Sequence, residues 1–455
     1  MQKKLFSDFG PVPSKLWKQR IQYELKGADY NDTLVWESPE GIKVKPFYHR
    51  DEAAGTYGVT TIQEFKIGQP VFVQNTESAL KRALKTVKKG AEALVFIIPD
   101  NNTDIKSLCE GLPESLPAFF YLPSLSIDLA KNIDAFAKRN KADYLIMADP
   151  VGHLAKEGNW YTGQDNFEVL NTLAISCKSP VISVNSSLYQ NSGANMVQQI
   201  AYTLAHANEY FNRIATIQNP VVIEAAVGSN YFFEIAKLRA IRLLFGTIAA
   251  EYGHNPNCHL IVSPTKRNKT LYDYNVNMLR TTTECMSAIL GGADTVVNLP
   301  YDTLYHKGNE FADRMARNQL LILKEESYFD KVANAADGTY YIEELTQQLA
   351  EKALELFKQI EAGGGFIEQL KAGNIQRKIQ ESATKEQELF DGGKEILVGT
   401  NKYINKSDTM GHDLELYPFM KVKPRKTLVT PIIEKRLAEN LEQQRLEEEK
   451  ESESH

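Results

Sequence analysis

The stretch PVVIEAAVGSNYFFEIAKLRAIRLLFGTIAAEYGHNPNCHLIVSP, residues 220–264, decides the fold class. It holds two short apolar runs, 221–228 and 259–264, which flank a longer run, 230–252, with the apolar spacing of a helix. Continuous apolar strands that alternate with helices are typical of a parallel sheet covered on both faces. The stretch therefore predicts one strand–helix–strand unit of an α/β protein.

The same alternation recurs between residues 60 and 330. The candidate strands are the short apolar runs 70–75, 93–100, 118–123, 143–150, 180–187, 221–228, 259–264 and 294–300. Helical patterns lie between them, notably at 76–89, 194–216, 230–252 and 275–290. Eight such units in about 270 residues fit a (β/α)8 barrel of the TIM type. A doubly wound open sheet is the alternative, because periodicity alone does not separate the two folds.

Residues 1–55 are predicted to form an N-terminal arm with a helix at 14–27 and a hairpin at 33–48. The arm is too small to bury its own large aromatic side chains. These side chains are Trp17, Trp36, Phe47 and Tyr48. They pack either on the barrel of the same chain or on a second chain, and the sequence favours the two equally. We expect the arm to be the segment that contacts a partner.

Three further parts are predicted to follow the arm. The barrel is expected to fill residues 56–330, and a helical extension that completes the barrel domain is expected at 331–425. Residues 426–455 are rich in charge and poor in apolar side chains. Such a composition favours a solvated helix that frays into a disordered tail.

Composition narrows the class of protein. A hydrophobic fraction of 43% is ordinary for a soluble globular chain, and a net charge of −6 does not favour nucleic-acid binding. The sequence has no run of about 18 apolar residues, so no membrane-spanning helix is expected, and its N-terminus lacks the apolar core of a signal peptide. The four cysteines form no CxxC pair, which predicts reduced thiols, a cytoplasmic location and no metal site.

Four ordered blocks resemble one enzyme family. They are AYTLAHANEYFNR (201–213), FFEIAKLRAIRLLF (232–245), LRTTTECMSAILGGAD (279–294) and FADRMARNQLLILKEES (311–327). Together they closely resemble the adenosylcobalamin-dependent acyl-CoA mutases. The opening LKGADYNDTLVWESPEGIKVKPFY (25–48) is similar to the N-terminus of the small subunits of that family.

The resemblance implies a fold and a chemistry. In this family an acyl-CoA is threaded through a (β/α)8 barrel that cobalamin caps. Homolysis of the cobalt–carbon bond gives an adenosyl radical, which permits a carbon-skeleton rearrangement. A separate C-terminal domain with the motif D-x-H-x-x-G supplies the cobalt ligand. None of the eight histidines of this sequence has an aspartate two positions before it, so the motif and its cobalamin domain are not expected in this chain.

Positions that carry chemistry in the family have changed identity here. Ungapped counting from the nearest blocks puts Leu188 at the histidine that contacts the thioester carbonyl and Thr60 at the catalytic tyrosine. Leucine has no group that donates a hydrogen bond or polarises a carbonyl. Thr303 stands at a glutamate and His306 at a small residue of the segment that packs against the corrin. We therefore expect no catalytic residue and no cofactor-binding residue in this chain.

Several of these residues also have an ordinary structural interpretation. Leu188 fits an ordinary barrel leucine, and His306 fits a surface or hydrogen-bonded histidine. Lys237, Arg239 and Arg242 could suggest a CoA phosphate site, but exposed or carboxylate-paired cations are the simpler expectation.

The resemblance implies a non-catalytic small subunit that pairs with a large subunit in a heterodimer. Adenosylcobalamin of the assembled enzyme would then be bound mainly by the large subunit, and none tightly by this chain. The first alternative is a catalytically active mutase barrel that uses cobalamin supplied by a separate protein. The second is a regulatory or chaperone-like module that acts on a mutase.

Overall fold

The computed structural model describes Leu5, residues 10–53, Gly55 and residues 57–59, 64–161, 165–421 and 424–453. Its centre is an eight-stranded parallel sheet with the strand order β6-β5-β4-β3-β10-β9-β8-β7. The two outer strands meet through a parallel bridge between Ala148 and Ile182, and the Ser183 amide donates to the Ala148 carbonyl at 3.1 Å. This contact closes the sheet into a (β/α)8 barrel, so the predicted fold is confirmed and the open-sheet alternative is wrong.

Strands occur in all eight predicted places. They are β3 (Lys66–Phe72), β4 (Ala93–Ile97), β5 (Ala118–Tyr121), β6 (Tyr144–Met147), β7 (Ser183–Asn185), β8 (Val221–Val227), β9 (Cys258–Pro264) and β10 (Thr295–Val296). The first strand was predicted at 70–75 and begins earlier, at Lys66. The reason is pairing, because Lys66 and Ile67 lie beside Thr295 and Val296 of β10 and thereby complete the ring.

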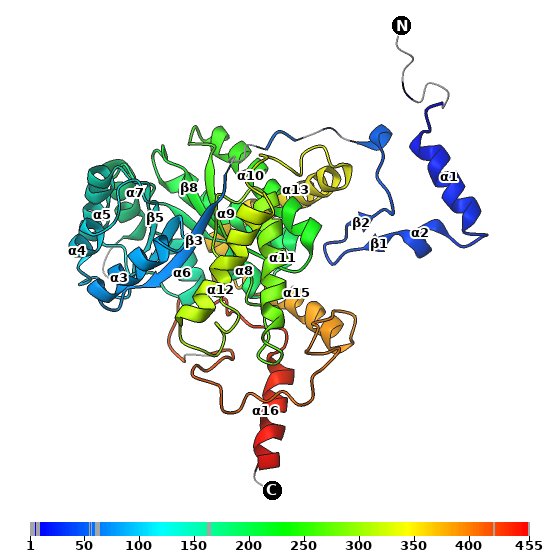
Figure 1. Cartoon of the computed structure of the whole chain (residues 1–455). Helices are drawn as coiled ribbons and strands as arrows, with labels where there is room; N and C mark the ends of the chain where they lie inside the picture. Colours follow the sequence, from blue (N-terminus) through cyan, green and yellow to red (C-terminus); the bar gives the residue numbers. More distant parts are fainter. Residues whose placement is uncertain are drawn as a thin grey trace.

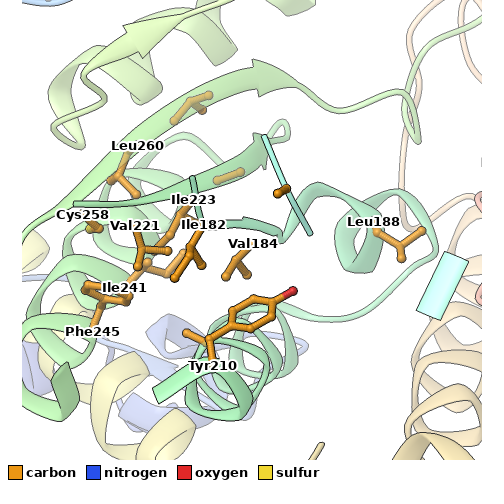
Figure 2. Close-up of a cluster of buried hydrophobic side chains, with 14 of the residues drawn as sticks. Ile182, Val184, Leu188, Tyr210, Val221, Ile223, Ile241, Phe245, Cys258 and Leu260 are labelled. Carbon is orange, nitrogen blue, oxygen red and sulfur yellow. The ribbon is translucent and has the colours of Figure 1, made fainter. Parts of the chain in front are cut away.

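Helices cover the outside of the barrel (Figure 1). They are α3 (Thr76–Val87), α4 (Ile105–Glu110), α5 (Ile127–Asn140), α6 (Pro150–Glu157), α7 (Asn166–Ser176), α8 (Ser187–Asn191), α9 (Met196–Arg213), α10 (Tyr231–Glu251), α11 (Val276–Leu290), α12 (Glu310–Leu321) and the π-helix η2 (Ile322–Glu326). Polar N-caps fix several starts, as where the Asn195 side chain accepts from the Gln198 amide. Figure 2 shows strand residues such as Val184, Ile223 and Leu260 facing Tyr210, Ile241 and Phe245 of α9 and α10.

The inside of the barrel holds a separate apolar layer. Its members are Ala93, Val95, Phe119, Leu145, Met147, Val222, Ile261 and Val297, and Tyr121 packs against them. The Phe119 ring also contacts the His259 imidazole, with the ring centroids 5.3 Å apart, and burial lowers the pKa of His259. A layer of such bulky side chains makes the interior a packed core rather than a pore.

Three helices follow the barrel, α13 (Tyr340–Ala362), α14 (Phe366–Lys371) and α15 (Asn374–Asp391). Helix α13 packs on α9 and α10. The buried Arg239 of α10 pairs with Asp337 and Glu343, and this pairing fixes the start of α13. Gly365 turns the chain between α13 and α14 at a φ of +89°, which glycine adopts without steric cost. These helices lie within residues 331–425, where the sequence predicts a helical extension.

The N-terminal arm contains α1 (Ser14–Glu24), α2 (Tyr30–Leu34), the hairpin β1 (Trp36–Glu37) and β2 (Lys43–Val44), and the 3-10 turn η1 (Arg50–Glu52). Figure 1 shows α1 and α2 projecting away from the barrel. Of the four aromatic side chains left open by the sequence, two pack on the barrel domain of the same chain. Trp36 lies edge-on to Phe233 at 5.8 Å and Tyr48 lies on Tyr341 at 5.0 Å. Trp17 stacks on Phe47 within the arm at 5.5 Å.

The charged C-terminal segment differs from its prediction. It does contain a helix, α16 (Glu439–Glu453). The expectation that this segment is solvated does not hold between residues 437 and 446, where Leu437, Ala438, Glu442 and Leu446 are buried. The physical reason is that its charges find buried partners on the barrel, as described below. Among the described residues, no helix is long and apolar enough to cross a membrane.

Candidate active-site face of the barrel

We call the ring of inward-facing side chains at the carboxyl ends of the strands the barrel mouth. This end carries the active site in TIM-barrel enzymes. Strand pairing places Phe72 beside Ile97, Ile97 beside Tyr121, and Tyr121 beside Met147. Across the barrel, Asn185 pairs with Glu224. Because side chains alternate along a strand, these residues sit directly above the apolar layer, and the mouth has one apolar side and one polar side.

Two half-buried side chains face each other at the mouth. The Tyr121 hydroxyl of β5 lies close enough to the Glu224 carboxylate of β8 to favour its charged form. Desolvation raises the pKa of Glu224, an effect that the Tyr121 hydroxyl partly offsets, and desolvation beside Glu224 raises the pKa of Tyr121 well above its ordinary value. The Ser187 hydroxyl reaches Asn185 Oδ1 at 2.7 Å and Glu224 Oε1 at 3.4 Å. These contacts place the chain's own side chains above the apolar layer.

Asp149, just after β6, organises the polar side of the mouth. Its Oδ1 accepts from His206 Nε2 at 2.8 Å, from the Tyr210 hydroxyl at 2.5 Å and from the Gly152 amide at 2.7 Å, and its Oδ2 accepts from the Asn185 amide at 2.7 Å. Burial raises the pKa of this carboxyl, but the imidazole and these donors outweigh burial and hold the pKa below its ordinary value. All four contacts are internal, so Asp149 acts as a structural anchor.

Leu188 lies on the short helix α8 and is 0% exposed (Figure 2). Its backbone amide donates to Asn185 Oδ1 at 3.1 Å, and its side chain belongs to the main core between the barrel and its helices. Thr60, the other position aligned with a catalytic residue, is outside the described residues. The prediction for Thr60 therefore stays a prediction.

A buried lysine links α8 to β8, α9 and α10. Lys237 Nζ donates to Gln190 Oε1 and Gln199 Oε1 at 2.9 Å and to the Ala226 carbonyl at 2.7 Å, and it pairs with Glu234 at 2.5 Å. Burial lowers the pKa of Lys237, and Glu234 opposes that shift. The other two cations proposed from the sequence are paired as well, Arg239 as above and Arg242 with Asp294 at 3.0 Å. All three cations are paired with carboxylates of the same chain, as one of the two interpretations from the sequence expected.

Thr303 and His306 lie in the loop that follows β10. His306 Nδ1 contacts Asp302 Oδ2 at 3.2 Å, and Asn309 Nδ2 donates to the same oxygen at 2.7 Å. Part of the C-terminal segment packs against this loop, since the Glu415 and Leu416 amides donate to the Tyr305 carbonyl at 2.9 and 2.8 Å. In the part of the chain that the structure describes, no three His, Cys, Asp or Glu side chains are grouped so as to hold a metal ion.

Sequence reasoning missed Tyr121, Glu224 and Phe119 as the residues that decide what the barrel interior holds. The period-two alternation of AFFY in β5 and VVIEAAV in β8 was the available signal, because it places Phe119, Tyr121, Val222 and Glu224 on one face. Which strand face points inward depends on closure of the ring, and the sequence does not state that closure.

The fold and its mouth define an α/β barrel enzyme scaffold whose interior is filled. Comparison with known families then identifies the group: the model for methylmalonyl-CoA mutase matches residues 146–449. The chain belongs to the methylmalonyl-CoA mutase family.

Three curated relatives illustrate the match. The methylmalonyl-CoA mutase small subunit of Porphyromonas gingivalis is 31% identical over 91% of this chain and 73% of its own length. The small subunit of Streptomyces virginiae is 32% identical over 56% of this chain and 43% of its own length. The methylmalonyl-CoA mutase of Escherichia coli is 33% identical over 85% of this chain, which spans 63% of that protein.

Proposed function

We propose that this chain is the small, non-catalytic subunit of a heterodimeric methylmalonyl-CoA mutase. In this proposal the large subunit interconverts methylmalonyl-CoA and succinyl-CoA by adenosylcobalamin radical chemistry. The present chain contributes a folded barrel that supports the large subunit. Family membership supports isomerase activity of the assembled enzyme, and the names of two relatives support the role of small subunit.

The observation that carries the proposal is the filled barrel axis. The family resemblance implies a substrate threaded along that axis, which requires a channel. Here the axis is occupied by the apolar layer around Phe119 and Leu145, with the side chains of Tyr121 and Glu224 above it. Opening a channel would remove buried apolar contacts that contribute about 25 cal/mol per Å².

The polar groups of the active-site face also favour cobalamin binding elsewhere. The loop that carries Thr303 and His306 contacts the segment around Glu415, and its Asp302 is already bonded to His306 and Asn309. The buried Leu188 offers no polar group to a thioester. We therefore assign cobalamin binding in the complex to the large subunit.

The partner would be contacted by the outer face of α1. Leu16 and Tyr23 of this helix are 51% and 77% exposed, and neither packs on the barrel. The helix carries the cations Lys15, Lys18 and Arg20 against one carboxylate, Glu24, in a chain of net charge −6. A basic, apolar helix face that projects from an acidic chain suits an acidic surface with an apolar groove on an unlike subunit.

Co-purification tests the contact. A double variant, Leu16→Asp with Tyr23→Asp, is expected to lose one-to-one association with the large subunit, because it puts charge in the apolar contact. The matched control is Ile175→Asp, which changes an exposed apolar side chain on α7 and is expected to keep association. If the double variant associates as well as the wild type, the contact lies elsewhere.

Activity tests the function itself. The chain alone, the large subunit alone and the pair are each assayed for conversion of succinyl-CoA to methylmalonyl-CoA with added adenosylcobalamin. We expect no turnover by this chain alone and full turnover by the pair. Robust turnover by this chain alone would support the alternative of an active barrel fed by a separate cobalamin protein.

The four free, buried cysteines are consistent with the cytoplasmic location that we propose.

A further inference from the structure

The C-terminal segment crosses the active-site face of the barrel. The Leu428 and Ile432 amides donate to the Gly158 and Ala155 carbonyls at 2.9 and 2.8 Å, beyond β6. The Lys435 amide donates to the Asn191 carbonyl at 3.1 Å, beyond β7. We call residues 410–421 and 424–446 the C-terminal cap.

The cap continues over the next two strand ends. The Leu437 amide donates to the Arg267 carbonyl at 2.9 Å, in the loop that follows β9, and the Leu416 amide reaches the loop that follows β10 as described above. A small apolar cluster joins these loops to the cap, with Leu271, Tyr272 and Tyr305 on the barrel side and Met410 and Leu446 on the cap side. The ends of β6, β7, β9 and β10 are therefore all tied to described residues of the C-terminal cap.

The ends of β3 and β4 contrast with the capped strands. Their mouth residues Phe72 and Ile97 are 51% and 41% exposed. The contrast identifies the cap as a cover for part of the face rather than a general feature of the loops.

Two buried charges lie at the centre of the cap. Arg436 is 4% exposed and Glu442 is 0% exposed, and they pair at 2.7 Å. Arg436 also donates to the Lys269 carbonyl at 3.0 Å and to the Pro418 carbonyl at 3.2 Å. Glu442 Oε1 accepts from the Leu271 amide at 2.8 Å. The pair thus joins both ends of the cap to the loop that follows β9.

That loop contains cations that are themselves buried and paired. Lys269 contacts Glu284 of α11 at 2.8 Å, and Arg267 pairs with Glu386 of α15 at 2.5 Å while it donates to the Lys435 carbonyl at 2.7 Å. Buried charges are tolerated only while each keeps its partners. Movement of the cap would remove the Lys435 carbonyl from Arg267 and the Arg436–Glu442 contacts from the loop, which would loosen it.

We infer that residues 410–421 and 424–446 are a built-in cap on the active-site face and that the Arg436–Glu442 pair is the clasp that holds it closed over residues 265–272. The cap occupies the face with the protein's own chain. The inference does not rest on the proposed function, because its test needs neither partner nor substrate.

Hydrogen exchange on the full chain, read by mass spectrometry, tests the clasp. Glu442→Gln keeps the shape and an acceptor for Leu271 but leaves Arg436 with an uncompensated buried charge. We expect exchange to rise at least about tenfold in peptides that cover 265–272 and 427–442, with the strands β3 to β5 unchanged. The matched control, Glu447→Gln, alters an exposed carboxylate on the same helix and is expected to leave exchange unchanged.

A variant without the two buried charges distinguishes loss of the ion pair from general destabilisation of the chain. The double variant Arg436→Met with Glu442→Leu leaves no buried charge, and we expect it to return exchange of 265–272 to within about threefold of the wild type. If Glu442→Gln does not fold, Leu446→Ala replaces it with the same readout, because it loosens α16 from Tyr272. Unchanged exchange at 265–272, or an equal rise in all strands, would overturn the inference.

Discussion

The two extensions of the barrel behave in opposite ways. The N-terminal arm is rich in aromatic side chains, yet its helix α1 projects from the body and leaves Leu16 and Tyr23 exposed (Figure 1). The C-terminal segment is rich in charge, yet Arg436, Glu439 and Glu442 are buried at its centre. Composition alone would assign the opposite roles. A segment is stabilised by the partners that its side chains contact. Charged side chains with buried partners therefore anchor their segment more firmly than exposed aromatic side chains do.

The arm itself contains a smaller version of the same contrast. Its hairpin tip enters the body, where Ile42 is fully buried in the main core and the Glu40 carboxylate accepts from the Met196 amide at the start of α9 at 3.4 Å. Helix α1, by contrast, contacts η1 through the bond from the Ser14 amide to Asp51 Oδ2 at 3.1 Å. The hairpin of the arm is therefore anchored in the body of the protein, whereas α1 presents an exposed face.

The largest expected effect is in the cap. Arg436→Ala leaves Glu442 buried without its cation, and we expect it to lower the free energy of unfolding by about 3–5 kcal/mol. The matched change in the arm is Arg20→Ala, which removes an exposed pair with Glu24 and should cost less than about 1 kcal/mol. Urea unfolding of both variants measures the difference. Equal losses would remove the contrast between the two extensions.

The hairpin tip should give the next largest effect. Ile42→Ala removes a buried side chain from the core, and we expect a loss of about 2–5 kcal/mol in the free energy that docks the hairpin. Hydrogen exchange of the hairpin amides reads this loss directly, and Leu16→Ala is the exposed control. If both variants exchange alike, the hairpin is no better anchored than α1.

The stability of the docked hairpin should depend on pH through Glu40. Burial raises the pKa of Glu40, with smaller opposing contributions from bonds to Ser38 and Met196. A carboxyl whose pKa is raised in the folded state contributes stability that is fully present below its ordinary value of 4.5 and is lost as pH rises through the raised value. Each unit of that rise corresponds to about 1.4 kcal/mol.

Glu40→Gln should remove this titration. Exchange of the hairpin amides, corrected for the intrinsic pH dependence, is expected to rise from pH 4.5 towards neutrality in the wild type and to stay level in the variant. Glu37→Gln, in the same hairpin but exposed, is the control that should keep the wild-type profile. A level wild-type profile would show that Glu40 does not titrate against docking.

The smallest effect is expected on α1. Tyr23→Ala changes a side chain that is largely in solvent, so its effect on the free energy of unfolding should stay within about 0.5 kcal/mol. Thermal unfolding of the isolated chain measures it. A loss above 2 kcal/mol would mean that α1 is held by the body after all.

The sequence was sufficient for the barrel because its signal is local and repeated. Each strand, such as 221–228, is a short apolar run next to a helical pattern, and eight repeats leave few folds open. The start of β3 at Lys66 was missed because pairing with β10 creates it, and that pairing joins residues more than 200 positions apart. Sequence reasoning also placed the arm helix and the hairpin turn, but it missed the short helix α2 just before the hairpin.

The active-site face was predicted less completely, for a physical reason. Family motifs pointed to Leu188, Thr303 and His306, and the structure describes where each lies. No local pattern indicated that Tyr121 meets Glu224 across the mouth or that Arg436 reaches Lys269, because such contacts depend on tertiary placement. Buried ion pairs look like solvated charge runs in a sequence, and this resemblance misled the interpretation of the C-terminal segment.

The filled axis is the central claim, and ligand stoichiometry tests it most directly. Equilibrium dialysis of the purified one-to-one complex with labelled methylmalonyl-CoA counts the molecules bound per complex and per isolated chain. The account predicts one molecule per complex and no saturable binding by this chain alone. Two molecules per complex, or saturable binding by this chain alone, would contradict it.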